Sequence, residues 1–353
     1  MKPSLMSDAI KACLMAGRAP FIEGPPGSAK TELVKLVSRE LDHNLLALDL
    51  SMIYDPVDTR GIPCNVDGHT VWLPPDYMAM NGHPTIVFLD DLPTAPPTSQ
   101  ANLFSLVLDH RLGGHPLPPH CKVMAAGNRV SDSSAAHAVP AAMANRFTWL
   151  RISVELDDWC AWGLANGIRT EVLAYHRFTG GGKLYPMYNS DNTPMKCGLC
   201  QKNLNAGELC GQCLRSYRAF PSPRTWEFTS QMLDQNPRPE IEFDLIAGNI
   251  GIPSATEFCG YLTLYRALPS LDAILLGPTS APVPKNPAAL YAVATALGRR
   301  ATANNLDAVT AYLDRLPPEF GVLTMRDAKN RDVNILNCRA AIAWMTRNND
   351  VLL

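Results

Sequence analysis

The chain has 353 residues, 46% apolar and 18% charged, which is enough for two domains with buried cores and too apolar for a disordered chain. Its formal net charge of −2 argues against a protein that coats nucleic acid by bulk charge, although a local basic patch stays open. Ten cysteines without a secretory signal indicate thiols in a reducing compartment, so we expect a cytoplasmic protein.

The N-terminal segments predict a helix, a strand and a second helix. Residues 1–20 place Asp8 and Lys11 inside an apolar pattern and never reach a membrane-spanning run, so we expect an amphipathic helix rather than a signal peptide. APFIE (19–23) is of strand type, and KTELVKLVSREL (30–41) has apolar residues at helical spacing.

Between this strand and helix, GPPGSAKT (24–31) fits the phosphate-binding pattern G-x-x-x-x-G-K-[ST], except that alanine replaces the second glycine. Backbone N–H groups at the start of the helix would hold the phosphates of ATP. Lys30 would reach the β- and γ-phosphates, and the Thr31 hydroxyl would bind Mg²⁺. We expect Ala29 in the helical region with a negative φ, where a Cβ costs little. The predicted nucleotide-binding residues are Gly24, Pro25, Pro26, Gly27, Ser28, Ala29, Lys30 and Thr31. The alternative is a Gly/Pro turn before a helix.

Two later strands end in polar residues. PTIVFLDDL (84–92) is typical of a strand buried on both faces of a parallel sheet, which puts Asp90 and Asp91 at its carboxyl edge. Carboxylates there would hold the Mg²⁺ water shell and polarise an attacking water, unless they only cap the next helix. CKVMAAGN (121–128) predicts a further strand, and Asn128 at its end is either a turn residue or a group that orients the water.

The segment CNVDGHTVW (64–72) predicts a β-hairpin with Asp-Gly at the turn, within a hairpin region of about 61–76.

Four cysteines form two Cys-x2-Cys pairs separated by nine residues. Such pairs place four thiolates at the corners of a tetrahedron, and a site with no spare position is typical of structural Zn²⁺. Disulfides and an iron–sulfur cluster are alternatives that spacing alone leaves open. The predicted zinc ligands are Cys197, Cys200, Cys210 and Cys213, in a small insertion of about residues 183–219.

Taken in order, GPPGSAKT, IVFLDD, AAGNR, PAAMANRF and SPRTWE resemble the MoxR-type branch of AAA+ ATPases over roughly residues 1–270. That branch commonly carries G-x-P-G-x-A-K-T, so the resemblance explains the alanine. It implies that Asp90 is the Walker B residue at the metal, that Asn128 is sensor 1, and that Asp91 stands where a glutamate usually acts.

The resemblance also assigns two arginines. It implies that Arg146 is an arginine finger that reaches a neighbouring subunit's γ-phosphate, and that Arg224 is sensor 2 on the lid; for each, a surface arginine is the alternative. Asp91 departs from the pattern, since its carboxylate stands roughly 1–1.5 Å further back than that of glutamate. We therefore expect slow hydrolysis.

The implied fold is an α/β P-loop AAA+ domain with a parallel sheet flanked by helices over residues 1–153. A helical lid and C-terminal helices, 154–353, would carry the zinc insertion. By resemblance the hairpin is a helix-2 insert, which in related ATPases faces the central pore of a ring, and Trp72 and His69 are the side chains of interest in it. A hairpin packed on its own domain is the alternative.

The implied function is an ATP-hydrolysing remodelling chaperone that acts as a homo-oligomeric ring, by resemblance a hexamer. It would mature or activate a protein client, with a von Willebrand factor A (VWA) domain partner. The alternative is a nucleic-acid-directed NTPase whose zinc module contacts DNA or RNA. The expected cofactors are ATP, Mg²⁺ and Zn²⁺, and we expect no membrane partner.

Overall fold

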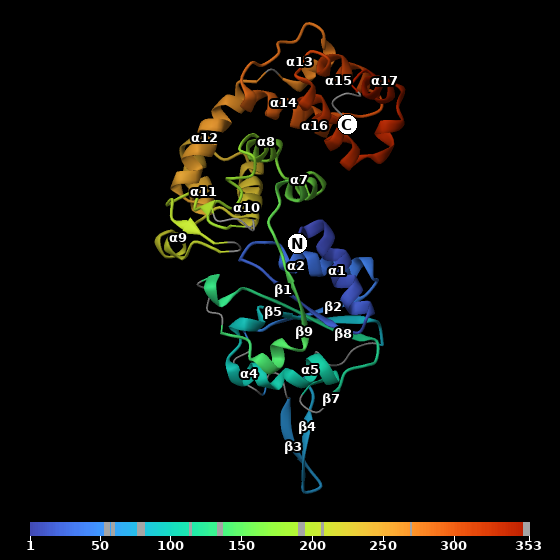
Figure 1. The fold of residues 1–353 in the computed structure, drawn as a ribbon, viewed down its shortest axis with the longest axis vertical. Helices are drawn as coiled ribbons and strands as arrows, with labels where there is room; N and C mark the ends of the chain where they lie inside the picture. The colour runs from blue at the N-terminus through green and yellow to red at the C-terminus, as the bar shows by residue number, and fades with distance from the viewer. Residues whose placement is uncertain are drawn as a thin grey trace. The chain divides into compact units, whose positions relative to one another are not determined.

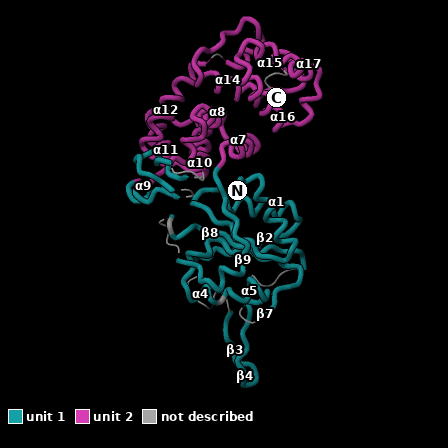
Figure 2. The backbone as a smooth tube through the Cα atoms, in the orientation of Figure 1, with its two compact units in different colours: residues 1–154, 187–216 teal, residues 155–186, 217–353 magenta. Residues whose placement is uncertain are grey.

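The computed structural model describes residues 1–52, 57, 61–75, 82–112, 115–132, 137–189, 195–205, 208–268 and 270–348. The chain divides into two compact units, shown in two colours in Figure 2. Unit 1 comprises Met1–Val154 and Met187–Ser216, and unit 2 comprises Glu155–Pro186 and Tyr217–Leu353. The four cysteines of the predicted zinc insertion therefore belong to unit 1. Parts of three predicted segments lie outside the described residues: 76 in the hairpin, 190–194 and 206–207 in the insertion, and 349–353 at the end.

Unit 1 is built on a five-stranded sheet in the order β2-β5-β8-β1-β9 (Figure 1). Every neighbouring pair in it is parallel. The strands are β1 (Ala19–Glu23), β2 (Asn44–Asp49), β5 (Thr85–Asp90), β8 (Cys121–Gly127) and β9 (Phe147–Arg151). The predicted α/β fold class is confirmed, and each of the predicted strands is present.

Helices cover both faces of this sheet (Figure 1). On one face, α1 (Pro3–Met15) and α2 (Lys30–Glu40) bury apolar side chains against residues such as Ile86 and Phe88 of β5. On the other face (Figure 1) lie α4 (Pro97–Asn102) and α5 (Phe104–Asp109), and Leu106 and Val107 of α5 share a buried core with Val87 and Leu89. Since successive side chains of a strand point to opposite faces, burial on both sides explains why β5 is apolar throughout.

Short elements connect the strands of unit 1. They are η2 (Leu92–Thr94), β6 (Arg111–Leu112), β7 (His115–Pro116), η3 (Val130–Asp132) and α6 (Ala141–Ala144). Gly127 at the end of β8 has no room for a side chain, because a Cβ there would lie 2.2 Å from Pro93 Cδ. This close contact brings the segments after β5 and β8 together at the carboxyl edge of the sheet.

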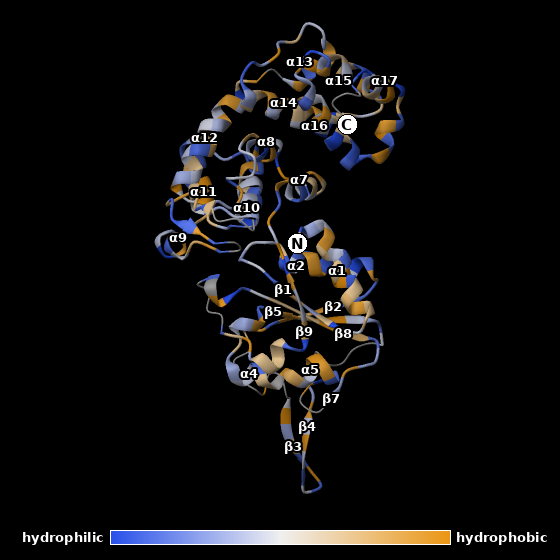
Figure 3. Cartoon of the chain, viewed as in Figure 1, coloured by the Kyte–Doolittle hydropathy of each residue, from blue (hydrophilic) through white to orange (hydrophobic). Residues whose placement is uncertain are grey.

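The predicted hairpin is present as β3 (Ile62–Val66) and β4 (His69–Leu73). Asp67 and Gly68 form its turn with φ of 49° and 79°, as a turn with positive φ at both central residues requires. Apolar stretches are visible along both strands in Figure 3. They include exposed side chains, among them Ile62 at 61% and Leu73 at 52% of full exposure.

Unit 2 is helical in its described part. Its elements are α7 (Leu156–Ala165), α8 (Thr170–Phe178), α10 (Pro223–Asp234), α11 (Pro239–Ile250), α12 (Ile252–Arg266), α13 (Leu271–Leu276), α14 (Pro287–Arg300), α15 (Leu306–Leu313), α16 (Pro318–Arg331), η4 (Val333–Asn337) and α17 (Arg339–Arg347). Ser222 and Thr225 form a capping box that starts α10. Of the helices described, none has the length and apolarity that crossing a membrane requires.

A buried ion pair joins three helices of unit 2. Arg177 of α8 donates to both carboxylate oxygens of Asp327 on α16, with Nη2 2.6 Å from Oδ1. Its Nη1 also donates to Thr295 Oγ1 of α14 at 3.0 Å. Burial raises the pKa of Asp327, and the guanidinium of Arg177 opposes that shift. The attraction between Arg177 and Asp327 thus offsets the free-energy cost of burying each charge.

We predict that Asp327→Ala lowers the free energy of unfolding by about 3–5 kcal/mol, because it leaves the Arg177 guanidinium buried and unpaired. Chemical denaturation followed by circular dichroism measures the change. The matched control is Asp314→Ala, which removes an exposed partner of Arg347 and should cost less than about 1 kcal/mol. Equal effects of the two substitutions would contradict this account of the pair.

Candidate nucleotide site and cysteine cluster

The loop between β1 and α2 wraps around the Lys30 ammonium group. Lys30 Nζ donates to Gly24 O at 3.0 Å and to Pro25 O at 3.1 Å, and its residue is only 8% exposed. The Ser28 hydroxyl donates to Pro25 O at 2.8 Å and closes the same turn. A phosphate oxygen is a stronger acceptor for an ammonium group than these uncharged carbonyls. The loop therefore presents a cation at the N-terminus of a helix, where anions bind.

Residues from three strand ends converge on this lysine. Lys30 Nζ donates to Asn128 Oδ1 at 2.7 Å, although the two residues lie 98 positions apart. Thr31 Oγ1 donates to Asp90 Oδ2 at 3.0 Å, across 59 positions. Because β5, β8 and β1 are neighbours in a parallel sheet, their carboxyl ends meet at one edge. The structure thus brings together Lys30, Thr31, Asp90 and Asn128, as the sequence predicts.

The carboxylate of Asp90 has an environment that suits a cation. Burial raises its pKa, while the hydrogen bond from Thr31 opposes this shift. An acid whose charge is disfavoured by burial gains from a nearby positive ion. The Thr31 hydroxyl and the Asp90 carboxylate are hard oxygen ligands of the kind that Mg²⁺ prefers, so these residues fit the expected ion.

The prediction for Ala29 is wrong. Its φ is 67° and its ψ is 24°, which is left-handed, and it stands just before the first residue of α2. Gly27 also has a positive φ, of 73°. The reason is geometric: left-handed turns at Gly27 and Ala29 fold the loop back, so that the carbonyls of Gly24 and Pro25 face the Lys30 ammonium group before the helix begins. The alanine therefore occupies a glycine conformation rather than avoiding it.

Asp91 is also left-handed, with φ of 49°. Its N–H donates to Asp90 Oδ1 at 3.0 Å, and its carbonyl accepts from the Thr94 hydroxyl at 2.6 Å. Aspartate tolerates this conformation better than most residues. These bonds fix the backbone of Asp91 beside Asp90, within the candidate site.

The two predicted arginines lie elsewhere in the chain. Arg146 follows α6, and its Nη1 donates to Phe104 O at 2.5 Å while its guanidinium carbon lies 5.6 Å from the Phe104 ring centroid. It is therefore held on the α5 side of unit 1 rather than at Lys30. Arg224 is exposed in the first turn of α10, in unit 2.

Ile152 is a neighbour of the loop that no sequence pattern indicates. A Cβ on Gly24 would lie 2.2 Å from Ile152 Cγ2, so the first loop glycine packs directly against the residue after β9. Gly24 N also donates to Gly127 O at 3.3 Å. No motif marks Ile152, because its importance comes from a contact that only the folded sheet creates.

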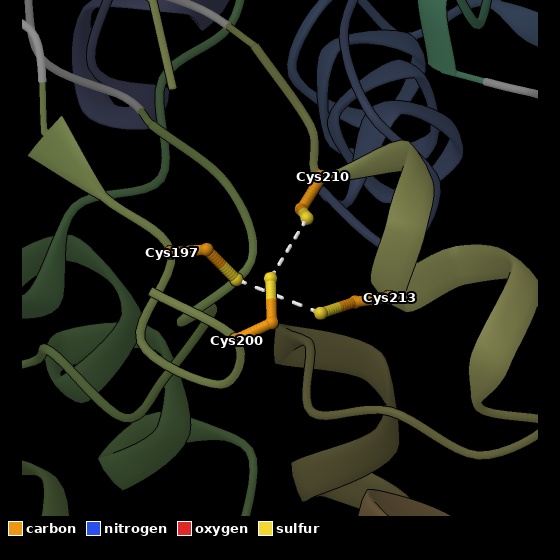
Figure 4. A group of neighbouring side chains, drawn as sticks. All are labelled: Cys197, Cys200, Cys210 and Cys213. Carbon is orange, nitrogen blue, oxygen red and sulfur yellow. Dashed lines mark hydrogen bonds between the residues drawn. The ribbon is translucent and has the colours of Figure 1, made fainter. Parts of the chain in front are cut away.

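The four predicted metal ligands form one cluster (Figure 4). They belong to a small module whose described elements are β10 (Met195–Lys196), β11 (Asn203–Leu204) and α9 (Gly211–Ser216). The Cys197 and Cys213 sulfurs are 3.7 Å apart, and the Cys200 and Cys210 sulfurs are 3.5 Å apart. All four lie within 4.8 Å of one another, and every one of these cysteines is a free thiol.

These distances fit one tetrahedral ion. Zn–S bonds of about 2.3 Å place two sulfurs about 3.8 Å apart. A disulfide would need about 2.05 Å. Within the cluster, burial raises the pKa of Cys197 and Cys213. At Cys200 burial acts in the same direction but is outweighed by hydrogen bonds from the Lys202 N–H and the other thiols, which lower the pKa. The spacing and number of the sulfurs therefore suit Zn²⁺, which binds them as thiolates.

Comparison with known proteins supports this description of unit 1. Residues 20–147 match the AAA domain of the dynein-related subfamily. This range holds the loop, both aspartates and Asn128, so residues 20–147 form a P-loop AAA domain of the kind found in ATPases.

Solved structures of AAA+ proteins are similar to the chain only at a low level. RuvB of Thermotoga maritima, a Holliday junction branch migration motor, matches over 88% of this chain and 85% of its own, with 15% identity and a TM-score of 0.36. NtrX of Brucella abortus with ADP matches over 91% and 68%, with 12% identity and a TM-score of 0.41. In another NtrX structure the match spans 47% of this chain and 42% of that one, at 10% identity and a TM-score of 0.33. Similarity at this level carries no information on what this chain binds.

We predict that Ala29→Gly stabilises the protein by up to about 1 kcal/mol. The left-handed conformation costs alanine about 1–2 kcal/mol, and glycine avoids this cost. Part of the gain is lost because glycine gives up more conformational entropy on folding. Thermal denaturation measures the change. Ala16 is the control: it is also exposed at a helix end, but its φ is −78°, so Ala16→Gly should lower stability. Opposite signs support the left-handed alanine, and equal signs contradict it.

Proposed function

We propose that this protein is an ATP-hydrolysing AAA+ machine of MoxR type that remodels a protein client. The observation that carries the proposal is the convergence of Lys30, Thr31, Asp90 and Asn128 at one sheet edge. A cation at a helix N-terminus beside a hydroxyl, a carboxylate and an amide is the set of groups that binding and cleaving a nucleoside triphosphate requires.

In this proposal each residue of the site has one task. Lys30 leaves the carbonyls of Gly24 and Pro25 and binds phosphate oxygens. When bound, Mg²⁺ supplies positive charge to the phosphates; Thr31 and Asp90 would hold it. Asn128, released from Lys30, orients the attacking water, and Asp91 accepts its proton.

The proposed working unit is a homo-oligomeric ring, by resemblance a hexamer. Arg146 supports this, because its guanidinium is held on Phe104 and not at the Lys30 of its own chain. An arginine offered to a neighbour's γ-phosphate would complete that neighbour's site. Arg224, on unit 2, is proposed as the residue that senses the nucleotide from the lid.

The proposed client is a protein, with a VWA-domain protein as the partner that delivers or receives it. The exposed apolar side chains of β3 and β4 support a protein contact, since nucleic acid is bound mainly through positive charge. Complexes of Asp91→Asn with ATP separate the two classes of client by whether they retain protein or nucleic acid.

We predict that Lys30→Ala abolishes measurable nucleotide binding, because it removes the cation at the phosphates. Titration of a fluorescent ATP analogue measures it. Lys35→Ala is the matched control on the same helix, since Lys35 pairs with Glu32 and is about half exposed; it should bind nucleotide as the wild type does. Tight binding by Lys30→Ala would place the nucleotide site elsewhere.

We predict that Arg146→Ala binds ATP but hydrolyses it at least about 10³-fold more slowly than the wild type. Mixing this variant with inactive Asp91→Asn should partly restore hydrolysis, because some interfaces then pair an intact finger with an intact site. Phosphate release measures the recovery, and labelled subunits confirm exchange. Exchange without recovery would show that Arg146 does not act between subunits.

A further inference from the structure

We propose that the cysteine module is a zinc-dependent clamp on the nucleotide site, so that zinc binding and nucleotide binding strengthen each other. Tyr188 joins the two sites as a positioning residue. Since the coupling requires a nucleotide at residues 24–31, it rests on the proposed function.

The first link runs from the metal ligands to Tyr188. The N–H of the ligand Cys210 donates to Met187 O at 2.8 Å. Tyr188 itself forms an isolated antiparallel bridge with Leu209, the residue directly before the ligand Cys210. Closing four thiolates around one ion fixes this backbone, because the binding free energy of a structural zinc is folding free energy.

The second link runs from Tyr188 to the nucleotide domain. Its hydroxyl donates to Ile152 O at 3.4 Å, and the Arg129 guanidinium carbon lies 5.7 Å from its ring centroid. Arg129 is held there by Asp132, with Nη2 2.7 Å from Oδ1. Tyr188 is 5% exposed, and burial raises the pKa of its phenol, which therefore stays protonated and able to donate. The Tyr188 side chain is thus held by two contacts, one through its hydroxyl to Ile152 and one through its ring to Arg129.

The third link ends at the phosphate loop. Ile152 packs against Gly24, the first residue of the loop. Arg129 directly follows Asn128, whose side chain accepts from Lys30 at 2.7 Å. The two contacts of Tyr188 therefore support the two backbone segments that position the lysine. The Tyr188 side chain thus links the cysteine module to both segments, the one at Ile152 and the one at Arg129.

Loss of zinc should weaken nucleotide binding for this reason. Without the ion, the backbone segment that carries Tyr188 loses its constraint, and the supports of Gly24 and Asn128 loosen with it. A nucleotide must then supply the ordering that the module otherwise provides. Thermodynamic linkage requires that nucleotide raise the affinity for zinc by the same factor, and such couplings are typically about 5–150-fold.

The experiment measures both sides of this linkage. Elemental analysis first establishes the metal of the purified protein, expected to be zinc near one per chain. The dissociation constant of a fluorescent ADP analogue is then measured on zinc-loaded and chelator-treated protein, and we expect it to rise about 5-fold or more on zinc removal. In parallel, competition with 4-(2-pyridylazo)resorcinol measures zinc affinity of the loaded protein with and without ADP. We expect the same factor.

Variants separate positioning from general stability. Tyr188→Leu should keep zinc but abolish the coupling, and Tyr188→Phe, which retains the ring beneath Arg129, should keep part of it. The control is Tyr185→Leu, a tyrosine with the same 5% exposure that belongs to unit 2. It should leave the coupling intact. Equal loss of coupling in both leucine variants would overturn the role of Tyr188.

The possible failures are distinct. If zinc-loaded protein binds no ADP, the proposed function falls. If ADP binds equally with and without zinc to folded protein, or leaves zinc affinity unchanged, the clamp is refuted while the nucleotide site stands. If the zinc-free protein does not stay folded, the competition measurement still decides, because it starts from loaded protein. The zinc assignment is overturned if the purified protein contains iron. It is also overturned if the protein contains no metal and the four cysteines of the module titrate as free thiols.

Discussion

The candidate site depends on the adjacency of β1 and β8 in a parallel sheet. Their register pairs Glu23 with Gly127, the residues that immediately precede Gly24 and Asn128. This pairing brings Lys30 and Asn128 within hydrogen-bond distance across 98 positions of chain. The neighbouring strand β5 adds Asp90 at the same edge. Every other feature of the site, including the loop turns and the contacts of the cysteine module, is arranged around this edge.

Tight packing at this edge explains its glycines. Gly24 and Gly127 are each closed by a neighbouring side chain, of Ile152 and Pro93 respectively, so a methyl group at either position would collide. Backbone segments that approach this closely cannot shift independently. A displacement of one strand end would therefore shift its neighbour, which is the property that the proposed coupling to the cysteine module requires.

Much of this arrangement was predictable from local sequence. The strands follow from continuous apolar runs, the loop from its motif, and the hairpin from Asp67 and Gly68 between alternating residues. The four cysteines follow from their spacing, because two short turns leave few geometries for four thiolates. These predictions succeed because the physical cause lies within a few residues of the pattern.

Other features were not predictable, since their causes are long-range. The conformation of Ala29 is imposed by the loop around Lys30, whereas a helix-forming residue before a helix predicts the opposite. The cysteine module is associated with unit 1 through the contacts of Tyr188 with Ile152 and Arg129, among others. No sequence motif includes Tyr188 or Ile152, and the motif that includes Arg129 gives no sign of this contact. The order of segments along the chain instead suggests a module within the helical region.

The surrounding structure of the candidate site holds two non-glycine residues, Ala29 and Asp91, in the strained left-handed conformation. Among the described non-glycine residues with positive φ, Ala29 alone lacks a polar side chain; the others are aspartate, asparagine, histidine or glutamine, which tolerate the conformation better. Such a position persists only where the surroundings determine it. Here the hydrogen bonds of Lys30 to Gly24, Pro25 and Asn128 fix both ends of the turn. In the proposed function a phosphate takes Lys30 away from these three acceptors. The bond from Ser28 to Pro25 O, the bond from the Gly24 N–H to Gly127 O and the packing of Gly24 on Ile152 do not involve the lysine, so they would still hold the loop. Ile152 accepts the hydrogen bond of Tyr188 and packs on Gly24, so this contact supports the loop whichever group Lys30 binds.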